Sequence, residues 1–281
     1  MSLSPPQTIA FIGGGNMASA LIGGLVRAGR APASILVVDP GTAQRDKLVA
    51  DFGVRTLPAA DAGLADAALV VWAVKPQLFA EAAAPCARWV AGALHLSVMA
   101  GIRSGTIARA VCAQPGQAPA AARIVRSMPN TPALIGRGIA GLFATPTVTA
   151  DERRLVAAVL APTGQTLWVA AEADLDAVTA LSGSGPAYVF YFVEAMMAAA
   201  QQMGLTPEQG KRLALATFDG ATALAAASDD PPALLRERVT SKGGTTHAAL
   251  HSLRGDAVAE AIIRAVRAAQ QRAAELGDEF S

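Results

Sequence analysis

The sequence predicts an α/β domain with a mostly parallel sheet, followed by an all-α domain. Short apolar runs alternate with helical patterns from Thr8 to about Val169, which is typical of βαβ units. Beyond Ala170 the strand pattern disappears and helix start and stop signals replace it. The later residues are also rich in alanine, which favours closely packed helices. We therefore divide the chain into residues 1–168 and 169–281.

The strands of the first domain are predicted where apolar runs are bounded by turn residues. Runs that are apolar throughout belong to strands buried on both faces, so helices should cover both sides of this sheet. The predicted strands are Ile9–Ile12, Ile35–Val38, Ala68–Val74, Ala93–Val98, Ala122–Val125 and Leu167–Val169. The predicted helices between them include Met17–Ala28, Ala43–Asp51 and Gln77–Val90.

The second domain is predicted from helix caps. A short helical stretch, Leu175–Leu181, precedes a long helix that Pro186 opens and Gly204 ends. Thr206, Pro207 and Gln209 supply an N-cap, a proline in the first turn and a capping-box partner for a helix that reaches about Ala227. Later helices should open at Pro231-Pro232, at Thr245 and at Asp256, which would cap a final helix from Ala257 to about Leu276.

The helix that begins at Pro186 carries apolar residues in every direction between Tyr188 and Val193. A helix that is apolar all round must be buried all round. A small α-domain can hardly cover it alone, so we expect a homodimer whose α-domains interleave. Burial of the second face by the sheet domain is the alternative.

Composition excludes several classes of protein. Among 281 residues, 23 lysines and arginines nearly balance 22 acidic residues, so no bulk charge attracts nucleic acid or anionic lipid. We find neither a signal peptide nor a membrane span and expect a cytoplasmic protein. Cys86 and Cys112 fit reduced core thiols. His95 lies in a predicted strand and belongs to the core, whereas His247 and His251 lack a third ligand, so we expect no metal site.

A glycine-rich turn follows the first predicted strand and fits G-x-G-x-x-A between a strand and a helix. Gly13 allows the tight turn, Gly15 lets the backbone approach a pyrophosphate, and the small Ala18 lets the helix pack closely on the strand. Asn16 and Met17 would start that helix beside the phosphates. The motif predicts dinucleotide binding and a Rossmann-like first domain, and a glycine-rich turn without a ligand is the alternative. The chain there reads Gly13-Gly14-Gly15-Asn16-Met17-Ala18.

Further candidate cofactor residues stand where predicted strands end. Asp39 could bind the ribose 2′-hydroxyl of NADH, whereas Arg45 could reach the 2′-phosphate of NADPH, so both dinucleotides stay open. Lys75 could face the ribose or the phosphates, or it could be a solvated loop lysine. The small Ala100 could admit a nicotinamide ring, and Asn130 lies in a proline-rigid segment that could form a wall behind it.

A second functional segment runs from Thr240 to Leu250, where a loop turns into an amphipathic helix. Free backbone N–H groups and the positive end of the helix dipole meet hydroxyl groups there. Such a helix start can hold a small carboxylate and place one hydroxyl against a neighbouring atom. An ordinary N-cap after a flexible loop is the alternative.

Five segments together resemble the motifs of pyrroline-5-carboxylate reductase, and the resemblance covers nearly the whole chain. The last two are specific, whereas the first is shared by many dehydrogenases. These segments are Ile12–Ala18, Val74–Gln77, Met128–Pro132, Leu181–Tyr188 and Thr240–Thr246.

The resemblance implies reduction of the cyclic imine 1-pyrroline-5-carboxylate to L-proline by NADPH or NADH, the last step of proline synthesis. It also implies a Rossmann domain followed by a helical domain that dimerises, often with dimers forming a decamer. Thr246 matches the threonine whose hydroxyl meets the imine nitrogen. Ser241, Gly244, Thr245 and Thr246 match the turn that binds the substrate carboxylate.

Two residues depart from the pattern of the resembled family. Lys242 replaces a usual proline, which loosens the loop and adds a positive charge beside the carboxylate site. Ala60 stands where many members have an asparagine near the cofactor, so that contact should be missing. Two rival hypotheses remain. A β-hydroxyacid dehydrogenase would use a helix lysine, but Lys211 lies in a polar turn of helix that fits a surface charge. A regulatory protein that binds the cofactor without catalysis is the other.

Overall fold

The structure is a computed structural model that describes residues 7–113, 116 and 118–280. It has two compact units. The first takes in the described residues up to Ser184 together with those from Ala269 onward, and the second is Gly185–Ala268. Residues 169–184 and the end of the chain therefore belong to the same compact unit as the sheet. The domain boundary at residue 168 stays a prediction.

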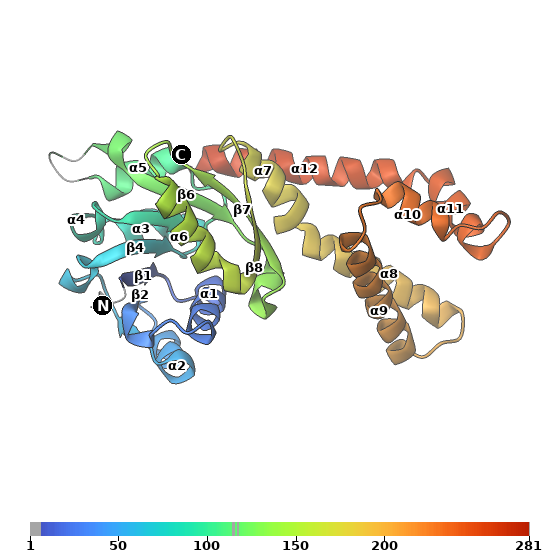
Figure 1. Ribbon diagram of the computed structural model, residues 1–281, viewed down its shortest axis with the longest axis horizontal. Coiled ribbons are helices and arrows are strands. Elements are labelled where there is room, and N and C mark those ends of the chain that lie inside the picture. The colour runs from blue at the N-terminus through green and yellow to red at the C-terminus, as the bar shows by residue number, and fades with distance from the viewer. Residues whose placement is uncertain (1–6, 114–115, 117, 281) are drawn as a thin grey trace. The chain divides into compact units, whose positions relative to one another are not determined.

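The first unit is built on a sheet whose described strands follow the order β3-β2-β1-β4-β5-β6-β7-β8 (Figure 1). All neighbouring pairs are parallel except β6 with β7. The predicted fold class, a mostly parallel sheet followed by helices, is confirmed. The strands are β1 Thr8–Ile12, β2 Ile35–Val38, β3 Arg55–Leu57, β4 Ala67–Trp72, β5 Leu94–Ser97, β6 Arg123–Met128, β7 Gly138–Ala144 and β8 Gly164–Trp168.

Alternate residues of β1 enter opposite cores. Ile9 and Phe11 pack in one apolar cluster, and Ala10 and Ile12 pack in another. Since successive side chains of a strand point to opposite faces, both faces of the sheet are buried, as the uninterrupted apolar runs predicted. The helices of this unit are α1 Asn16–Arg27, α2 Thr42–Phe52, α3 Phe79–Ala83, α4 Ala87–Val90, α5 Ser104–Val111, α6 Ala150–Leu160 and α7 Asp174–Val178.

Several predicted elements of the first unit differ from those observed. The single helix expected over Gln77–Val90 is divided into α3 and α4, because Pro85 between them has no N–H to donate. The strands β3 and β7 and the helices α5 and α6 were missed. For α6 a signal existed: Thr149 and Glu152 form a capping box at its start, with each side chain bonded to the other's backbone N–H. The last strand, β8, begins three residues before the predicted Leu167.

Two candidate residues lie in the core as expected. Trp72 Nε1 donates to His95 Nδ1 at 3.2 Å, and burial, with a smaller effect of Arg123, lowers the pKa of His95 to about 3. His95 is therefore a neutral core residue at ordinary pH. Cys86 is buried, and burial raises the pKa of its thiol to about 11. The thiol form of Cys86 therefore dominates, which suits a core residue.

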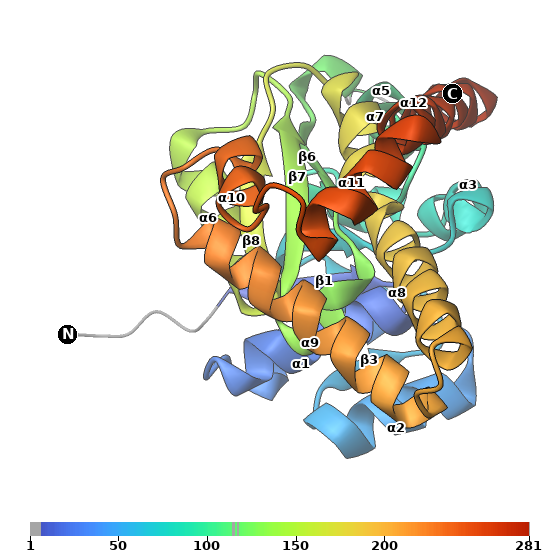
Figure 2. The same cartoon turned by 90° about the vertical axis from the view of Figure 1, so that its right-hand side faces the viewer.

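The second unit is helical, and Figure 2 shows α8 and α9 joined by a short turn. The predicted capping box of α9 is confirmed, with Thr206 and Gln209 as its partners. The prediction for Asp256 is wrong, because its N–H closes the end of α11 on the Ser252 carbonyl. Ala257, with φ of +50°, donates to the Arg254 carbonyl and separates Asp256 from α12. The helices are α8 Gly185–Gln202, α9 Pro207–Ala226, α10 Pro232–Arg238, α11 Thr245–Gly255 and α12 Val258–Glu279, whose last residues belong to the first unit.

Candidate functional site

The turn between β1 and α1 is shaped by glycines. Gly13 has φ of +94°, and its N–H donates to the Val38 carbonyl at 2.9 Å. A Cβ on Gly13 would lie 2.8 Å from the carbonyl oxygen of Ala73, the residue after β4, so the turn approaches this backbone too closely for any side chain. Around Gly15, by contrast, a Cβ would meet no heavy atom within 4 Å. The backbone of Gly15 is therefore open to a ligand.

This turn leads into α1 without a side-chain cap. The first helical hydrogen bond runs from Ser19 N–H to the Gly15 carbonyl. The N–H groups of Gly15, Asn16 and Met17 donate to no other residue that the structure describes. Unpaired N–H groups at a helix start bind phosphate, so the residues present fit a dinucleotide's pyrophosphate.

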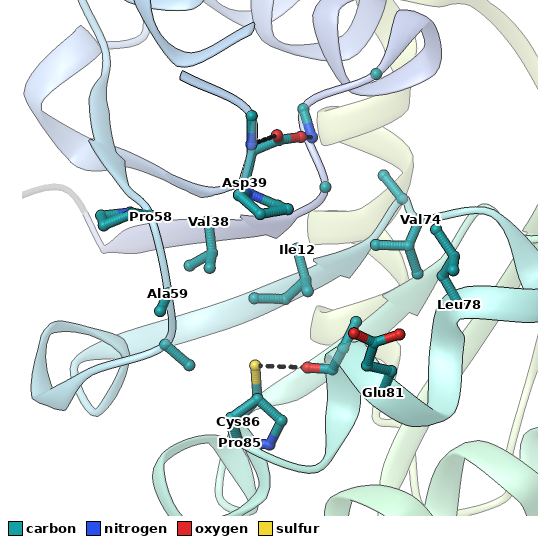
Figure 3. A pocket seen from close by; sticks show the side chains of 18 of the residues that line it. Ile12, Val38, Asp39, Pro58, Ala59, Val74, Leu78, Glu81, Pro85 and Cys86 are labelled. Carbon is teal, nitrogen blue, oxygen red and sulfur yellow. Dashed lines mark hydrogen bonds between the residues drawn. The ribbon is translucent and has the colours of Figure 1, made fainter. Parts of the chain in front are cut away.

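A cavity of about 600 Å³ opens beside this turn, between the ends of β1, β2 and β4 (Figure 3). Four of the predicted cofactor residues line it together: Gly13, Gly15, Asp39 and Lys75. Ligands of open parallel sheets bind outside the carboxyl ends of the strands, which is where this cavity lies. Ala60, the alanine that departs from the resembled family, also lines it.

The wall of the cavity away from the glycine turn was missed from the sequence. Figure 3 shows Leu78, Glu81 and Cys86 around the lower part of the cavity, and Cys86 Sγ donates to the Ala82 carbonyl at 3.1 Å. Leu78 directly precedes α3, Glu81 lies on it and Cys86 follows it. A continuous helix was expected there, so no sequence signal brought them to the cavity.

Asp39 is fixed by two backbone amides. Its Oδ2 accepts from Gly14 N–H and its Oδ1 from Gly41 N–H, both at 2.8 Å. Arg45 does not line the cavity among the described residues. It donates to the carbonyls of Asp39 and Pro40 at 2.8 Å, and to the Thr42 hydroxyl at 3.0 Å.

Ala100 and Asn130, predicted to lie near a nicotinamide, belong to other loops of the sheet edge and do not line this cavity among the described residues. Ala100 follows β5 and is partly buried. Asn130 follows β6, where its Oδ1 accepts from Ile139 N–H at 3.0 Å and its Nδ2 donates to the Ser182 carbonyl at 3.2 Å. The Asn130 side chain therefore ties three segments together, and the cofactor roles of both residues stay predictions.

The predicted carboxylate turn lies in the second unit, at the start of α11. Gly243 has φ of +75°, and Gly244 is the N-cap. A Cβ on Gly244 would lie 2.5 Å from Ser241 Oγ, so a side chain there would displace that hydroxyl. The N–H groups of Thr245 and Thr246 donate to no other described residue. The turn thus brings two unpaired N–H groups and the Ser241 and Thr246 hydroxyls into one short segment, as an anion site requires.

A network of charged residues in the first unit was also missed, because its members come from distant parts of the chain. Arg126, on β6, is only 4% exposed and donates to Glu172 at 2.9 Å. Glu172 also accepts from Ser104, from its N–H at 2.6 Å and from its hydroxyl at 2.7 Å. Arg103 forms a two-bond pair with Asp176 at 2.8 and 3.1 Å. These contacts hold the segment before α8 against the sheet.

We expect this network to make the first unit sensitive to acid. Burial alone would raise the pKa of Glu172, but the hydrogen bonds from Ser104 and the charge of Arg126 hold it below its ordinary value of 4.5. A carboxyl whose pKa is lower in the folded state contributes stability above its unfolded pKa, and this stability is lost as the pH falls through the folded pKa. The unfolding temperature should therefore fall as the pH drops below about 4.5.

Calorimetric unfolding of the wild type and Glu172→Gln at pH 3 to 7, roughly the range in which carboxyl groups titrate, measures this effect. Glu172→Gln should have a lower unfolding temperature than the wild type at neutral pH. Its unfolding temperature should also fall less steeply as the pH drops, which gives a flatter acid limb of the curve. Glu237→Gln, which changes an exposed glutamate of α10, is the control and should keep the wild-type limb. An equally steep acid limb in Glu172→Gln would contradict the assignment.

Among the described residues, no three histidine, cysteine or acidic side chains are grouped so that they could hold a metal ion. None of the helices in the described part of the chain is both long and apolar enough to cross a membrane.

Comparison with known proteins gives matches at both ends of the chain. Residues 172–276 match the family described as pyrroline-5-carboxylate reductase dimerisation, and residues 8–101 match the family described as NADP oxidoreductase, coenzyme F420-dependent. The chain is 41% identical to pyrroline-5-carboxylate reductase of Pseudomonas aeruginosa, with 99% of each chain covered. It is 38% identical to the enzyme of the same name from Pasteurella multocida, covering 96% of this chain and 98% of that one.

Solved structures agree with these matches. Pyrroline-5-carboxylate reductase from Coxiella burnetii superposes with a TM-score of 0.87 at 36% identity, covering 97% of this chain and 99% of the other. Pyrroline carboxylate reductase from Plasmodium falciparum, solved with NADP bound, gives a TM-score of 0.83 at 26% identity, with 96% and 98% covered.

Proposed function

This chain belongs to the pyrroline-5-carboxylate reductase family, and we infer from that membership that it reduces 1-pyrroline-5-carboxylate to proline with NAD(P)H, the last step of proline biosynthesis. The observation that carries the inference is the 41% identity to a reductase of this name along 99% of the chain. The cavity beside Gly13 and the turn before α11 supply the two kinds of site that such a reaction needs.

We propose that the first unit holds the dinucleotide by the β1–α1 turn. The N–H groups of Gly15, Asn16 and Met17 bind the pyrophosphate, and Asp39 and Lys75 face the ribose and phosphates. Ala100 and Asn130 lie beside the nicotinamide in this proposal. When bound, the reduced nicotinamide supplies the hydride that the imine carbon accepts.

The substrate carboxylate is bound in this proposal by Ser241 and by the N–H groups of Thr245 and Thr246, while Gly244 leaves room for it. Hydrogen bonds to a charged group contribute about 1.5–3 kcal/mol each, against about 0.3–1 kcal/mol for the helix dipole. The direct contacts therefore dominate the binding of the carboxylate. Lys242, exposed in the same turn, adds a positive charge that favours the same anion.

The Thr246 hydroxyl is the proposed catalytic group. It donates a hydrogen bond, or relays a proton, to the imine nitrogen. An imine carbon becomes more electrophilic when its nitrogen is protonated or hydrogen-bonded, so this contact should strengthen as hydride arrives. The rest of the catalysis is alignment of two bound reactants.

A dimer, and a decamer built from dimers, are part of the same proposal. The match to a dimerisation family covers α8, where Phe190 is 60% and Tyr191 74% exposed in the single chain. Contiguous exposed apolar side chains indicate an interface. A cytoplasmic location completes the proposal, because reduced nicotinamide dinucleotides are available there.

We expect a double change of Phe190 and Tyr191 to glutamate to shift the protein to a smaller species, because buried charges without partners oppose association. Sedimentation velocity of the variant and the wild type measures this change. The control is Val49→Glu, which alters an apolar residue of α2 that is 47% exposed and lies outside the dimerisation match. Dissociation of the control, or an unchanged variant, would contradict the α8 interface.

Oxidation of the dinucleotide, followed by absorbance, tests the function directly. Purified protein should consume NADH or NADPH when 1-pyrroline-5-carboxylate is added and should form proline. Failure with the imine together with oxidation of a hydroxy acid would favour a hydroxyacid dehydrogenase. Dinucleotide binding without turnover of either substrate would favour a regulatory protein.

A further inference from the structure

The carboxylate of Asp39 has a fixed position at the edge of the cavity. Gly14 N–H and Gly41 N–H each hold one of its oxygens at 2.8 Å, and the dashed lines in Figure 3 mark both bonds. A Cβ on Gly14 would lie 3.2 Å from Asp39 Oδ2, so the glycine also allows this close approach. Because two backbone amides hold it, the carboxylate cannot easily rotate away from an unfavourable ligand.

The charges around the cavity add to this effect. Among the described residues that line it, Lys75 is the single cation, against the carboxylates of Asp39 and Glu81. A second negative group brought close to Asp39 would be repelled, and repulsion inside a partly enclosed cavity is stronger than in bulk water.

Arg45 is the cation that could offset this repulsion, but its guanidinium already donates hydrogen bonds to other groups of the protein. One guanidinium nitrogen, Nη1, donates to the carbonyls of both Asp39 and Pro40 at 2.8 Å. The other, Nη2, donates to the Thr42 hydroxyl at 3.0 Å. These bonds use three of the five N–H groups of the guanidinium, so a phosphate would have to share Arg45 with the start of α2.

We propose that Asp39 makes this enzyme select NADH over NADPH. The inference rests on the proposed dinucleotide site and deepens it by naming the cofactor. The two dinucleotides differ at the ribose 2′ position, where NADH has a hydroxyl and NADPH a phosphate. A hydroxyl donates a hydrogen bond to a fixed carboxylate, whereas a phosphate has negative charge and only acceptor oxygens to offer.

Binding without catalysis tests this inference. Isothermal titration of the full chain with ADP-ribose and with 2′-phospho-ADP-ribose, in the absence of imine, compares the two 2′ groups directly. The wild type should bind ADP-ribose at least about tenfold more tightly, as expected for a like-charge contact in a site of intermediate polarity. The ratio of the two dissociation constants should decrease as salt is added, because ions screen the repulsion. These wild-type results stand even if a variant misfolds.

Asp39→Asn removes the charge and keeps the size and one acceptor. The preference should fall to about threefold or less, mainly through tighter binding of the 2′-phosphorylated ligand, since the removed repulsion is the assumed cause of the tenfold ratio. The matched control is Asp61→Asn: Asp61 Oδ1 likewise accepts from the N–H two residues on, Gly63, at 2.8 Å, but Asp61 does not line the cavity among the described residues. The control should keep the wild-type ratio.

Three results would overturn the proposal: equal or tighter binding of the 2′-phosphorylated ligand by the wild type, an unchanged ratio in Asp39→Asn, or a selective loss of that ligand in Arg45→Ala. Binding of neither ligand would remove the dinucleotide site and the proposal with it. If ADP-ribose binds with the expected preference but no imine is reduced, the proposed function fails while the assignment of Asp39 stands.

Discussion

Thr246→Ala should lower the turnover of 1-pyrroline-5-carboxylate by roughly 10²–10⁴, the usual contribution of a positioned proton donor. The expected loss is in kcat rather than in KM, because the hydroxyl interacts most strongly with the imine nitrogen as hydride arrives. The substrate carboxylate should still bind, since the Thr246 N–H and the Ser241 hydroxyl remain. Steady-state kinetics at saturating dinucleotide measures both constants.

Two further variants separate chemistry from structure in this experiment. Thr246→Ser keeps a hydroxyl and should recover most of the rate. Thr222→Ala is the control for loss of a helix threonine hydroxyl, because Thr222 lies on α9 and donates to the Phe218 carbonyl at 2.7 Å. An unchanged kcat in Thr246→Ala, or a serine variant as slow as the alanine variant, would remove this hydroxyl from the mechanism.

Gly13→Ala should disrupt both the dinucleotide turn and the stability of the first unit. A non-glycine residue in the left-handed region costs about 1–2 kcal/mol, and forcing a side chain into a packed site costs about 1–3 kcal/mol more. At Gly13 the new Cβ would lie 2.8 Å from the Ala73 carbonyl oxygen and 2.9 Å from Val74 Cγ1. The turn must therefore shift, and we expect ADP-ribose affinity to fall roughly 10- to 100-fold.

Gly29→Ala provides a matched control for the backbone strain. Gly29 has φ of +93°, almost the same as the +94° of Gly13, but a Cβ there would meet no heavy atom within 4 Å. Gly29→Ala should lose only the stability that the backbone strain costs, and its affinity for ADP-ribose should be unchanged. Denaturant unfolding and titration of both variants give the comparison. If the two variants lose equal stability and both bind normally, the close approach at Gly13 does not matter.

The local parts of the fold could be predicted from the sequence because their signals are local. The strand Ile9–Ile12 and the glycine turn after it follow from a short apolar run and the conformational freedom of Gly13. The start of α9 follows from Thr206 and Gln209, which satisfy N–H groups within one turn of each other. In such cases the residues that determine the structure are neighbours in the chain.

Other elements depend on distant partners and escaped prediction. The strand β7, Gly138–Ala144, contains two glycines and has no strong strand pattern, but it pairs with β6 and β8 and is mostly buried. A Cβ on Gly141 would lie 2.6 Å from Val178 Cγ1, so its glycine is required by packing against α7. The spacing of residues in the sequence does not predict that contact, because the two residues are distant in the chain.

A dinucleotide turn at one end of this chain and an anion-binding helix start near the other are predicted from sequence alone, because each motif is a short run of residues whose backbone groups need only one another. The hydrogen bonds that Asp39 and Arg45 form, by contrast, could not be chosen from the sequence. From the sequence both could reach a ribose, but the fold places Gly14 N–H against the carboxylate and three oxygen acceptors around the guanidinium. A side chain's hydrogen-bonding capacity is limited, and only the folded chain shows which groups have already used it.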